Sequence, residues 1–348
     1  MTERGSISRL QDVSRLTVDE DRIFSATHEE ILNGETTDIY FVKTRDVLKS
    51  GSLLGTDVVA EVFTRKSGVF AGLSEMLFLL KDCGDIKVEA LSEGDEFSSR
   101  EVLVRISGPY GSFGMLETVY LGMLASSTAW ATAARECVVA AQGKPVLCFG
   151  ARHVHPAVAP AMERVAVRFG GCQAASCILG AKLAGMEPSG TVPHAAILIA
   201  GDTLKLARLY DQAMAPDEPR IVLVDTFKDE TEESLRIAEA LDGRLSGVRL
   251  DTPGERGGVT PELVRELRWR LDCAGFKEVS IIASGGITPE RIKVLSEAGV
   301  DSFGVGSYIS NPSPRDMTMD IKMIDGRPIA KRGRLPGLQE NPRLKRVL

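Results

Sequence analysis

The 348-residue sequence lacks three features, and each absence excludes a class of protein. Its longest apolar runs, such as residues 195–200, are far shorter than the roughly 20 residues that cross a bilayer. Its six cysteines include no Cys-x-x-Cys pair, so neither a disulfide framework nor a zinc site is expected. Its net charge of −6 offers nucleic acid no general attraction. We therefore expect no membrane span, no zinc and no nucleic-acid partner. The N-terminal residues resemble no signal or transit peptide, which favours a cytoplasmic protein.

Glycine, in contrast, is abundant. The 34 glycines fall largely in pairs or at the ends of apolar runs, where a backbone turns tightly or approaches a ligand. Hydrophobic residues make up 43% of the chain, which is enough for a substantial core. The length fits either one large barrel or two modest domains.

The pattern of apolar residues divides the chain into four parts. We expect an N-terminal tail, an α+β domain, an α/β barrel and a basic C-terminal segment that packs back on the α+β domain, at residues 1–20, 21–125, 126–312 and 313–348. Within the α+β domain, residues 86–91 and 101–106 alternate charged and apolar side chains around a turn, which predicts a hairpin. A run without proline, residues 112–141, predicts one or two helices at the junction with the barrel.

Beyond residue 143, short apolar or β-branched runs alternate with amphipathic helical patterns. This alternation predicts a parallel sheet that curls into an incomplete, TIM-like α/β barrel with about seven strands. The expected strands are 145–151, 171–176, 194–200, 220–227, 246–252, 279–286 and 302–309. Two of the expected helices open with Thr-Pro. This pair indicates a helix start, because threonine caps a helix and proline is tolerated in its first turn. A site in such a barrel lies at the carboxyl ends of the strands.

Polar and small residues gather at these strand ends. They are Arg152, His153, His155, Asp225, Arg249, Asp251, Ser284, Gly285, Gly286, Gly304, Gly306 and Ser307, and His194 stands at the start of the third expected strand. The glycines of the last two strands would let backbone N–H groups approach an anion, and each turn is followed by a helical amino end or turn that favours negative charge. This pattern indicates phosphate binding, with a purely structural turn as the alternative.

Arginines support an anionic ligand. Arg135, Arg152, Arg168 and Arg249 carry guanidinium groups that match phosphate and carboxylate geometry, although Arg168 could equally belong to a solvated helix face. Asp225 and Asp251, each in an Asp-Thr pair, could hold a divalent cation or accept hydrogen bonds from sugar hydroxyls, or could cap a turn.

The histidines allow a different class of protein. His153 and His155 alternate along a strand and could bind a metal together with His194 and an aspartate, as in a barrel hydrolase. Pro156 argues against this reading because it ends the strand, and such a hydrolase would not need two glycine-rich phosphate turns. His194 itself could be catalytic or a core histidine.

The order of the motifs resembles that of the nicotinate phosphoribosyltransferases, within the type II phosphoribosyltransferase family that also contains the quinolinate and nicotinamide enzymes. From residue 33 to 309, the motifs TTDIYF (36–41), GARHVHP, GTVPH, VLVDTF, VRLDT and ASGG follow in the family's order. The resemblance implies a homodimer or higher homo-oligomer with a shared active site. It also implies formation of nicotinate mononucleotide from nicotinate and phosphoribosyl pyrophosphate, with Mg²⁺ and with ATP as a co-substrate.

The resemblance further implies a role for each candidate residue. Tyr40 would stack on the pyridine ring, Arg249 would hold nicotinate, and Arg135, Arg152 and His153 would meet the pyrophosphate or the pyridine carboxylate. Asp225 and Asp251 would position ribose hydroxyls or magnesium, and His194 would be phosphorylated transiently. The 5-phosphate would be held by Ser284, Gly285, Gly286, Gly304, Gly306 and Ser307. Three alternatives stay open: a decarboxylating quinolinate phosphoribosyltransferase, a metal-dependent barrel hydrolase, and a sugar-phosphate sensor without catalysis.

Overall fold

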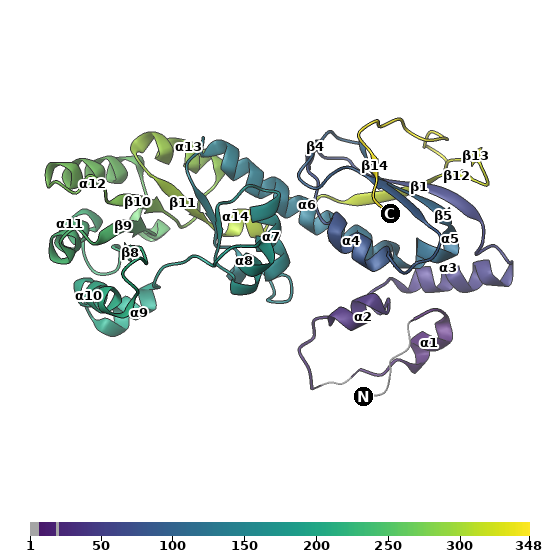
Figure 1. Cartoon of the computed structure of the whole chain (residues 1–348), viewed down its shortest axis with the longest axis horizontal. Coiled ribbons are helices and arrows are strands. Elements are labelled where there is room, and N and C mark those ends of the chain that lie inside the picture. Colours follow the sequence, from purple (N-terminus) through teal and green to yellow (C-terminus); the bar gives the residue numbers. More distant parts are fainter. Residues whose placement is uncertain (1–6, 19–20) are drawn as a thin grey trace. The chain divides into compact units, whose positions relative to one another are not determined.

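The chain forms two compact units. The computed structural model describes residues 7–18 and 21–348. The first unit comprises the chain up to Thr132 together with Ser313–Leu348, and the second comprises Ala133–Pro312. Helix α6 (Glu117–Ala140) starts in the first unit and ends in the second (Figure 1).

The first unit is built on a six-stranded antiparallel sheet with the order β13-β12-β1-β5-β3-β14. Its strands are β1 (Asp57–Thr64), β3 (Lys87–Ala90), β5 (Val102–Pro109), β12 (Met317–Ile324), β13 (Arg327–Pro328) and β14 (Lys345–Arg346), and a separate pair is formed by β2 (Gly68–Val69) and β4 (Glu96–Phe97). The hairpin expected from the alternating pattern is confirmed, because β3 pairs antiparallel with β5. The C-terminal segment supplies three strands of this sheet, so it is part of the fold of the first unit.

Short helices accompany the sheet of the first unit. They are α1 (Leu10–Arg15), α2 (His28–Leu32), α3 (Ile39–Ser50), α4 (Leu73–Leu80), α5 (Tyr110–Phe113) and the 3-10 turn η1 (Gly114–Leu116). The expectation of a loose tail over residues 1–20 is corrected for the described residues 7–18. Ile7 is buried and its N–H donates to the carbonyl of Asn33 at 2.9 Å, while Asp12 accepts hydrogen bonds at the start of α1. Residues 1–6 and 19–20 lie outside the described residues.

A partly buried carboxyl lies at the start of α6. Burial raises the pKa of Glu117 to about 7, and the negative charge of Asp320 on β12 adds to the shift. The same environment raises the pKa of the Tyr110 phenol to about 12, with burial again the larger cause and Glu117 the second. The ionised form of Glu117 therefore opposes folding at neutral pH.

Replacing Glu117 by glutamine should stabilise the protein at alkaline pH and leave its stability unchanged at pH 4. A carboxyl whose pKa rises on folding destabilises the folded state increasingly between its ordinary pKa of 4.5 and its folded value of about 7, and by a constant amount above that. Because solvent still reaches the group, we expect about 1–2 kcal/mol at pH 8. Thermal unfolding at pH 4 and pH 8 measures this. Glu262→Gln, on the solvent-exposed start of α12 (Pro261–Cys273), is the control for the loss of a surface carboxylate.

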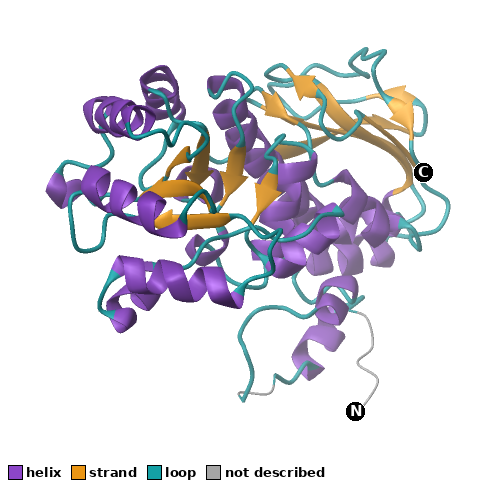
Figure 2. Cartoon of the chain, turned by 60° about the vertical axis from the view of Figure 1, so that its left-hand side comes forward, coloured by secondary structure: helices purple, strands orange, loops and turns teal. Residues whose placement is uncertain are grey.

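The second unit contains a six-stranded parallel sheet with the order β7-β6-β11-β10-β9-β8. Its strands are β6 (Val146–Cys148), β7 (Ala174–Ala175), β8 (Arg220–Leu223), β9 (Leu245–Leu250), β10 (Ser280–Ala283) and β11 (Ser302–Val305). Its other elements are the helices α7 (Ala159–Arg168), α8 (Ile178–Ala184), α9 (His194–Ala200), α10 (Thr203–Ala213), α11 (Glu230–Leu241), α12, α13 (Pro289–Ala298) and α14 (Ser307–Ser310), and the 3-10 turns η2 (Ala151–His153) and η3 (Gly254–Arg256). Helix α10 packs on β8 and α11 on β9, outside the sheet (Figures 1 and 2).

The predicted Thr-Pro helix starts are confirmed. The hydroxyls of Thr260 and Thr288 accept hydrogen bonds from the backbone N–H groups of Leu263 and Arg291, at the amino ends of α12 and α13.

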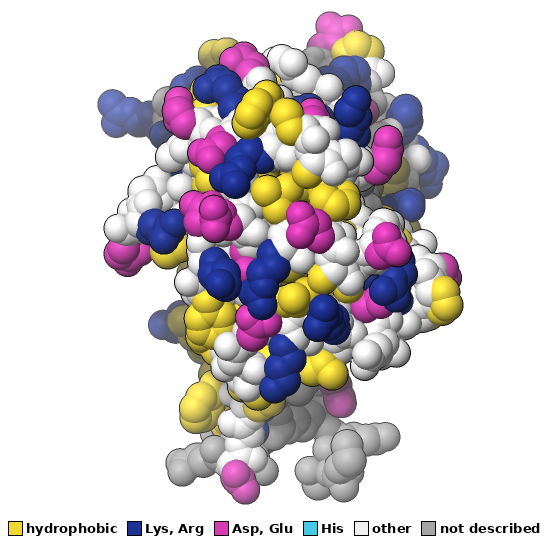
Figure 3. All heavy atoms as spheres, turned by 90° about the vertical axis from the view of Figure 1, so that its left-hand side faces the viewer, with side chains coloured by type: hydrophobic (Ala, Val, Ile, Leu, Met, Phe, Trp, Pro, Cys, Tyr) yellow, Lys and Arg dark blue, Asp and Glu magenta, His cyan; other side chains and the backbone are white. Residues whose placement is uncertain are grey.

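Figure 3 shows the face of the molecule on the left of Figure 1, where basic and acidic side chains are intermixed.

The strand expected at residues 194–200 is wrong, because this segment forms helix α9. A short apolar run fits a strand or a helix equally well, and here only one face is covered: Ile197 is 1% exposed and Ile199 is 87% exposed. Gly201 ends the helix with a φ of 79°, in the left-handed region.

This helix leaves the sheet open. The last strand, β11, pairs with the first, β6, but β7 and β8 form the two edges, and α9 lies in the chain between them. The second unit is therefore an incomplete barrel with six strands. The last expected strand also ends early, since β11 stops at Val305 and α14 begins at Ser307. Among the described residues, no helix has the length and apolar content that a membrane span requires.

Candidate active site

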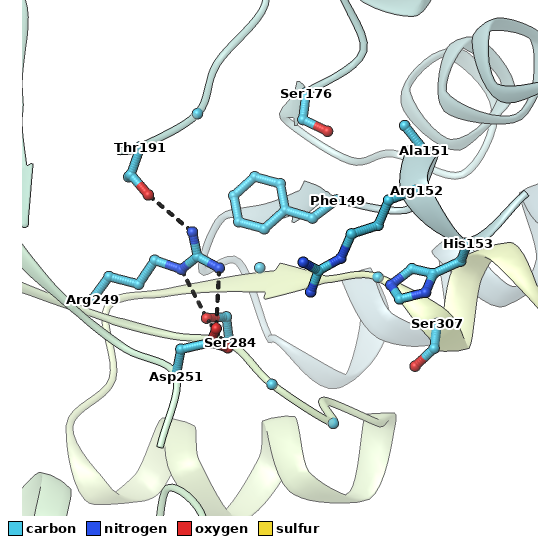
Figure 4. Close-up of a pocket in the computed structure, with 15 residues that line it drawn as sticks. Phe149, Ala151, Arg152, His153, Ser176, Thr191, Arg249, Asp251, Ser284 and Ser307 are labelled. Carbon is cyan, nitrogen blue, oxygen red and sulfur yellow. Dashed lines mark hydrogen bonds and ion pairs between the residues drawn. The ribbon is translucent and has the colours of Figure 1, made fainter. Parts of the chain in front are cut away.

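A cavity of about 350 Å³ opens at the carboxyl ends of the strands of the second unit (Figure 4). It is lined by Phe149, Ala151, Arg152, His153, Ser176, Gly190, Thr191, Arg249, Asp251, Ser284, Gly285, Gly286, Gly304, Gly306 and Ser307. Most of these residues end or follow five of the six strands, β6, β7, β9, β10 and β11, while Gly190 and Thr191 lie between α8 and α9. Ten of them are residues that the sequence singled out, so the expectation that strand ends converge on one site is met by the geometry.

Arg249 is held rigidly in the wall of the cavity. Its Nε donates to Ser284 Oγ at 2.8 Å and its Nη1 donates to Thr191 Oγ1 at 2.9 Å (Figure 4). Ser284 Oγ in turn donates to Asp251 Oδ1 at 2.8 Å. Burial lowers the pKa of the Arg249 guanidinium, and the carboxylates of Asp251 and Asp225 oppose this shift. The group stays charged, because arginine does not lose its proton in proteins.

Asp225 and His194 form a pair behind this wall. His194 is the first residue of α9, and its Nε2 lies 3.1 Å from Asp225 Oδ1. The Asp225 side chain is only 1% exposed, and its Oδ2 has no hydrogen-bond partner among the described residues. Burial raises the pKa of Asp225, while His194 lowers it and Asp251 adds a smaller upward shift. Oδ2 is thus a buried acceptor that a hydroxyl or a cation could satisfy.

The glycines of the site have two different roles. Gly285 and Gly286 have φ angles of 81° and 61°, a left-handed turn that other residues rarely adopt, and it leads to the amino end of α13. A Cβ at Gly286 would meet nothing within 4 Å, so the backbone there is open to a ligand. This turn has the geometry and the helix end that favour a phosphate.

Gly304 and Gly306 make room for side chains of the site. A Cβ at Gly304 would lie 2.4 Å from the Phe149 ring, and one at Gly306 would lie 2.8 Å from His153 Nε2. The space that the sequence interpretation gave to a phosphate at these two positions is therefore filled by Phe149 and His153. Both glycines still line the cavity.

Besides His194 and Asp225, which lie behind the wall, three further predicted site residues do not line the cavity. The guanidinium of Arg135 on α6 donates to the carbonyls of Phe169 and Gly170 at 2.8 and 3.2 Å, which ties α6 to the end of α7. Arg168 is exposed in the last turn of α7. Tyr40 belongs to α3 of the first unit, is 55% exposed, and has its ring 4.2 Å from that of Phe41. The structure gives Arg135 a structural contact that no sequence pattern indicated.

The histidine metal site is not formed by the described residues. His153 lines the cavity, but the ring of exposed His155 accepts a hydrogen bond from the N–H of Ala157 at 3.2 Å. Within residues 7–18 and 21–348, no three His, Cys, Asp or Glu side chains converge with a geometry that could hold a metal ion. The two histidines diverge because the chain turns into η2 directly after β6.

Sequence reasoning missed five lining residues: Phe149, Ala151, Ser176, Gly190 and Thr191. The Phe149 ring centre lies 5.1 Å from the Arg249 guanidinium carbon, and Figure 4 shows the ring beside the space between Arg249 and Arg152. Phe149 directly precedes the motif GARHVHP, and Thr191 lies inside GTVPH. Reading these motifs for apolar and hydroxyl residues as well as charges would have found both.

Comparison with known proteins agrees with this geometry. The family model for the N-terminal domain of quinolinate phosphoribosyl transferase matches residues 38–128, and the model for the C-terminal domain matches residues 130–320. Together these matches span most of the chain. The protein belongs to the quinolinate phosphoribosyl transferase family.

The relatives are named either nicotinate-nucleotide pyrophosphorylase or nicotinate phosphoribosyltransferase. A solved structure of a nicotinate-nucleotide pyrophosphorylase from Pyrococcus furiosus is 41% identical, with a TM-score of 0.87, and the match covers 91% of this chain and 82% of that one. A nicotinate phosphoribosyltransferase of Mycobacterium tuberculosis is 30% identical over 260 residues, or 72% of this chain and 56% of the relative. A probable carboxylating nicotinate-nucleotide pyrophosphorylase of Methanothermobacter thermautotrophicus is 22% identical, covering 77% of this chain and 90% of the relative. The chain thus spans little more than half the length of the Mycobacterium relative.

Proposed function

We propose that the protein transfers the phosphoribosyl group of phosphoribosyl pyrophosphate to the ring nitrogen of a pyridine carboxylate. The products would be nicotinate mononucleotide and pyrophosphate, together with CO₂ when the acceptor is quinolinate, and the reaction would belong to NAD biosynthesis. The observation that carries the proposal is one cavity that combines an anion-binding glycine turn, the cations Arg152 and Arg249, and the aromatic ring of Phe149. A phosphorylated sugar and a flat, negatively charged heterocycle need these three features together.

The residues divide between the two substrates. Ser284, Gly285 and Gly286 would bind the 5-phosphate at the amino end of α13, with Ser307 beside them. The pyridine ring would lie against Phe149 with its carboxylate toward Arg249. Arg152 and His153 would meet the pyrophosphate, and Figure 4 shows the Arg152 guanidinium directed into the cavity. A volume of about 350 Å³ suits small ligands of this kind.

Catalysis would depend on position and charge. When pyrophosphate leaves, positive charge develops on the ribose carbon, and the carboxylate of Asp251, which lines the cavity, would stabilise it and hold the ribose hydroxyls. The negative charge of Asp225 behind the wall would add to this stabilisation. Magnesium would arrive with the phosphoribosyl pyrophosphate and neutralise the leaving group. Asp225 Oδ2, which has no partner within residues 7–18 and 21–348, could accept a hydrogen bond from a hydroxyl or bind this cation.

The comparisons favour quinolinate as the acceptor. Quinolinate has a second carboxylate that is lost as CO₂, and the carboxylating archaeal relative is named for the reverse of that reaction. The pyrophosphorylase structure is also more similar to this chain than the nicotinate phosphoribosyltransferase is. The sequence motifs had favoured nicotinate, with quinolinate as the alternative.

Nicotinate is the second candidate, supported by the His194–Asp225 pair. Hydrogen bonding of Nε2 to Asp225 would leave Nδ1 of His194 free to accept a phosphoryl group from ATP. A quinolinate enzyme has no need of a phosphorylated histidine. A homodimer in which exposed Tyr40 contributes to a shared site belongs to the same proposal, and light scattering of the purified protein tests the dimer.

One experiment separates the acceptors. The protein is incubated with phosphoribosyl pyrophosphate, magnesium and either quinolinate, nicotinate or nicotinamide, with and without ATP, and mononucleotide is measured by mass. Product from quinolinate with one CO₂ per mononucleotide, independent of ATP, supports the first acceptor. Product from nicotinate that increases with ATP supports the second. Absence of product from all three acceptors contradicts the proposed function.

Replacing His194 by alanine should abolish any stimulation by ATP and leave a slow, ATP-independent synthesis. The reason is that alanine offers no nitrogen to phosphorylate, whereas the lining residues stay in place. Rates with and without ATP measure the effect, and His155→Ala, an exposed histidine outside the cavity, is the control. A variant that responds to ATP as the parent does would show that His194 has no phosphoryl-accepting role.

A further inference from the structure

A buried carboxylate behind the cavity connects two of the loops that line it. Glu163 on α7 is 0% exposed. One of its oxygens, Oε1, accepts hydrogen bonds from the Ala151 N–H at 3.1 Å and from Ser176 Oγ at 3.0 Å. The other, Oε2, accepts from the Cys177 N–H at 2.6 Å. Three donors from two loops therefore converge on one side chain.

Both loops present side chains to the cavity. Ala151 begins η2, and the next two residues are Arg152 and His153, which line the cavity. Ser176 lines it from the end of β7. Glu163 thus reaches the backbone that carries Arg152 and His153 and also a hydroxyl on the opposite loop.

The loop after β7 follows a short edge strand. Strand β7 is an edge of the open sheet and has only two residues in register with β6, Ala174 and Ala175. An edge strand this short fixes the following backbone weakly. The sheet reaches as far as Ser176, whose N–H donates to the Cys148 carbonyl at 3.2 Å. The hydrogen bonds that Ser176 Oγ and the Cys177 N–H donate to Glu163 add a constraint beyond this point.

The environment of Glu163 is sealed from water. Helix α8 packs closely on it, since a Cβ at Gly180 would lie 3.1 Å from the Glu163 Cβ. Burial raises the pKa of Glu163, and the hydrogen bonds from Cys177, Ser176 and Ala151 oppose this shift. Among the described residues, no lysine or arginine forms an ion pair with it. Burying a carboxylate without a neighbouring cation costs folding free energy. The three hydrogen-bond donors offset much of this cost and hold the Glu163 side chain in place.

We propose that Glu163 is a positioning residue for the phosphoribosyl transfer. By fixing Ala151 and Ser176 relative to each other, it sets the place of Arg152 and His153 at the pyrophosphate. This inference rests on the proposed function. Glu163 touches no substrate, and its effect passes through the two loops.

The test is Glu163→Gln, which keeps the volume but turns one acceptor oxygen into an NH₂ group. That group would face a backbone N–H, so one loop loses its hydrogen bond. We expect about a 10-fold rise in the KM for phosphoribosyl pyrophosphate and in the Kd for inorganic pyrophosphate, with a smaller change in kcat. Calorimetric titration with pyrophosphate measures the Kd without turnover.

The matched control is Glu233→Gln. Glu233 is another glutamate of the second unit with 0% exposure, but its carboxylate contacts Arg236, which does not line the cavity. It should lose stability without a change in KM or in pyrophosphate affinity. A second variant, Gly180→Ala, presses on the Glu163 side chain without removing it and should raise the same two constants by a smaller factor.

The outcomes are distinguishable. A rise in KM and Kd in Glu163→Gln and Gly180→Ala, but not in Glu233→Gln, supports the inference. Parental values in a folded Glu163→Gln variant overturn it, as do equal changes in Glu163→Gln and Glu233→Gln. If Glu163→Gln does not fold, unchanged constants in Gly180→Ala overturn it. A parent protein that neither binds pyrophosphate nor forms mononucleotide contradicts the proposed function itself.

Discussion

Replacing Asp225 by asparagine should lower kcat/KM by about 100-fold or more and, at neutral pH, raise the thermal stability of the protein. In the proposed reaction, positive charge develops on the ribose, and the substitution removes a buried negative charge behind the cavity wall that would stabilise it. Deleting one preorganised electrostatic group has an effect of this size. Asp225 Oδ2 has no hydrogen-bond partner among the described residues. The substitution removes the negative charge of the carboxylate, so this position can no longer serve as a charged ligand for a hydroxyl or a cation.

The gain in stability follows from the direction of the pKa shift. Burial raises the pKa of Asp225 above its ordinary value of 3.8, and the attraction of His194 offsets only part of this. A carboxyl with a raised folded pKa destabilises the folded state at pH values above its unfolded pKa. Asparagine removes that cost, so the stabilisation should be present at pH 7 and vanish as the pH falls below about 3.8.

A loss of activity together with a gain in stability would show that Asp225 contributes to activity at the expense of stability. Steady-state kinetics at pH 7.5 and thermal unfolding at pH 7 and pH 3.5 measure both. Asp272→Asn on α12, where the carboxylate accepts from Arg268 at 2.8 Å on the surface, is the control and should leave kcat/KM unchanged. An Asp225→Asn variant with parental activity, or one that loses activity only because it unfolds, would refute the assignment.

Replacing Gly304 by alanine should destroy the acceptor part of the site and lower kcat/KM by at least about 100-fold. The added Cβ would lie 2.4 Å from one carbon of the Phe149 ring, which is closer than carbon atoms can approach. The ring must move, and Arg249 packs beside it. We expect a destabilisation of about 1–3 kcal/mol from overpacking.

A second substitution separates the steric effect from the loss of the ring. In the double variant Gly304→Ala/Phe149→Ala, the clash is gone, so stability should recover in part while activity stays low. Chemical unfolding and kinetics on the single and double variants measure this. Gly254→Ala, where an added Cβ meets nothing within 4 Å, is the control. Full activity in Gly304→Ala would show that Phe149 does not shape the acceptor site.

Much of the site could be predicted from the sequence because strand ends in a parallel sheet converge. Once Arg249 and Asp251 are placed at the end of one strand and Ser284 to Gly286 at the end of another, parallel pairing of those strands brings them to the same edge. The helix starts at Thr260 and Thr288 were equally readable, since capping depends on residues close in the sequence.

Structural roles that depend on tertiary packing could not be predicted from the sequence. The run 194–200 is apolar enough for a strand, and only its surroundings decide that it forms α9 and leaves the sheet open. Gly304 and Gly306 look like phosphate-binding glycines until the rings of Phe149 and His153 are seen to fill their space.

The sequence by itself determined most of the alternation of strands and helices, the polar strand ends and the glycine turn at Gly285 and Gly286, because each depends on residues within a few positions of one another. The tertiary structure alone decided which arginines reach the cavity, which glycines seat a side chain, and that Glu163 ties two loops together. Those properties depend on distances between residues far apart in the chain, such as the 3.0 Å between Glu163 and Ser176, and no local pattern encodes them.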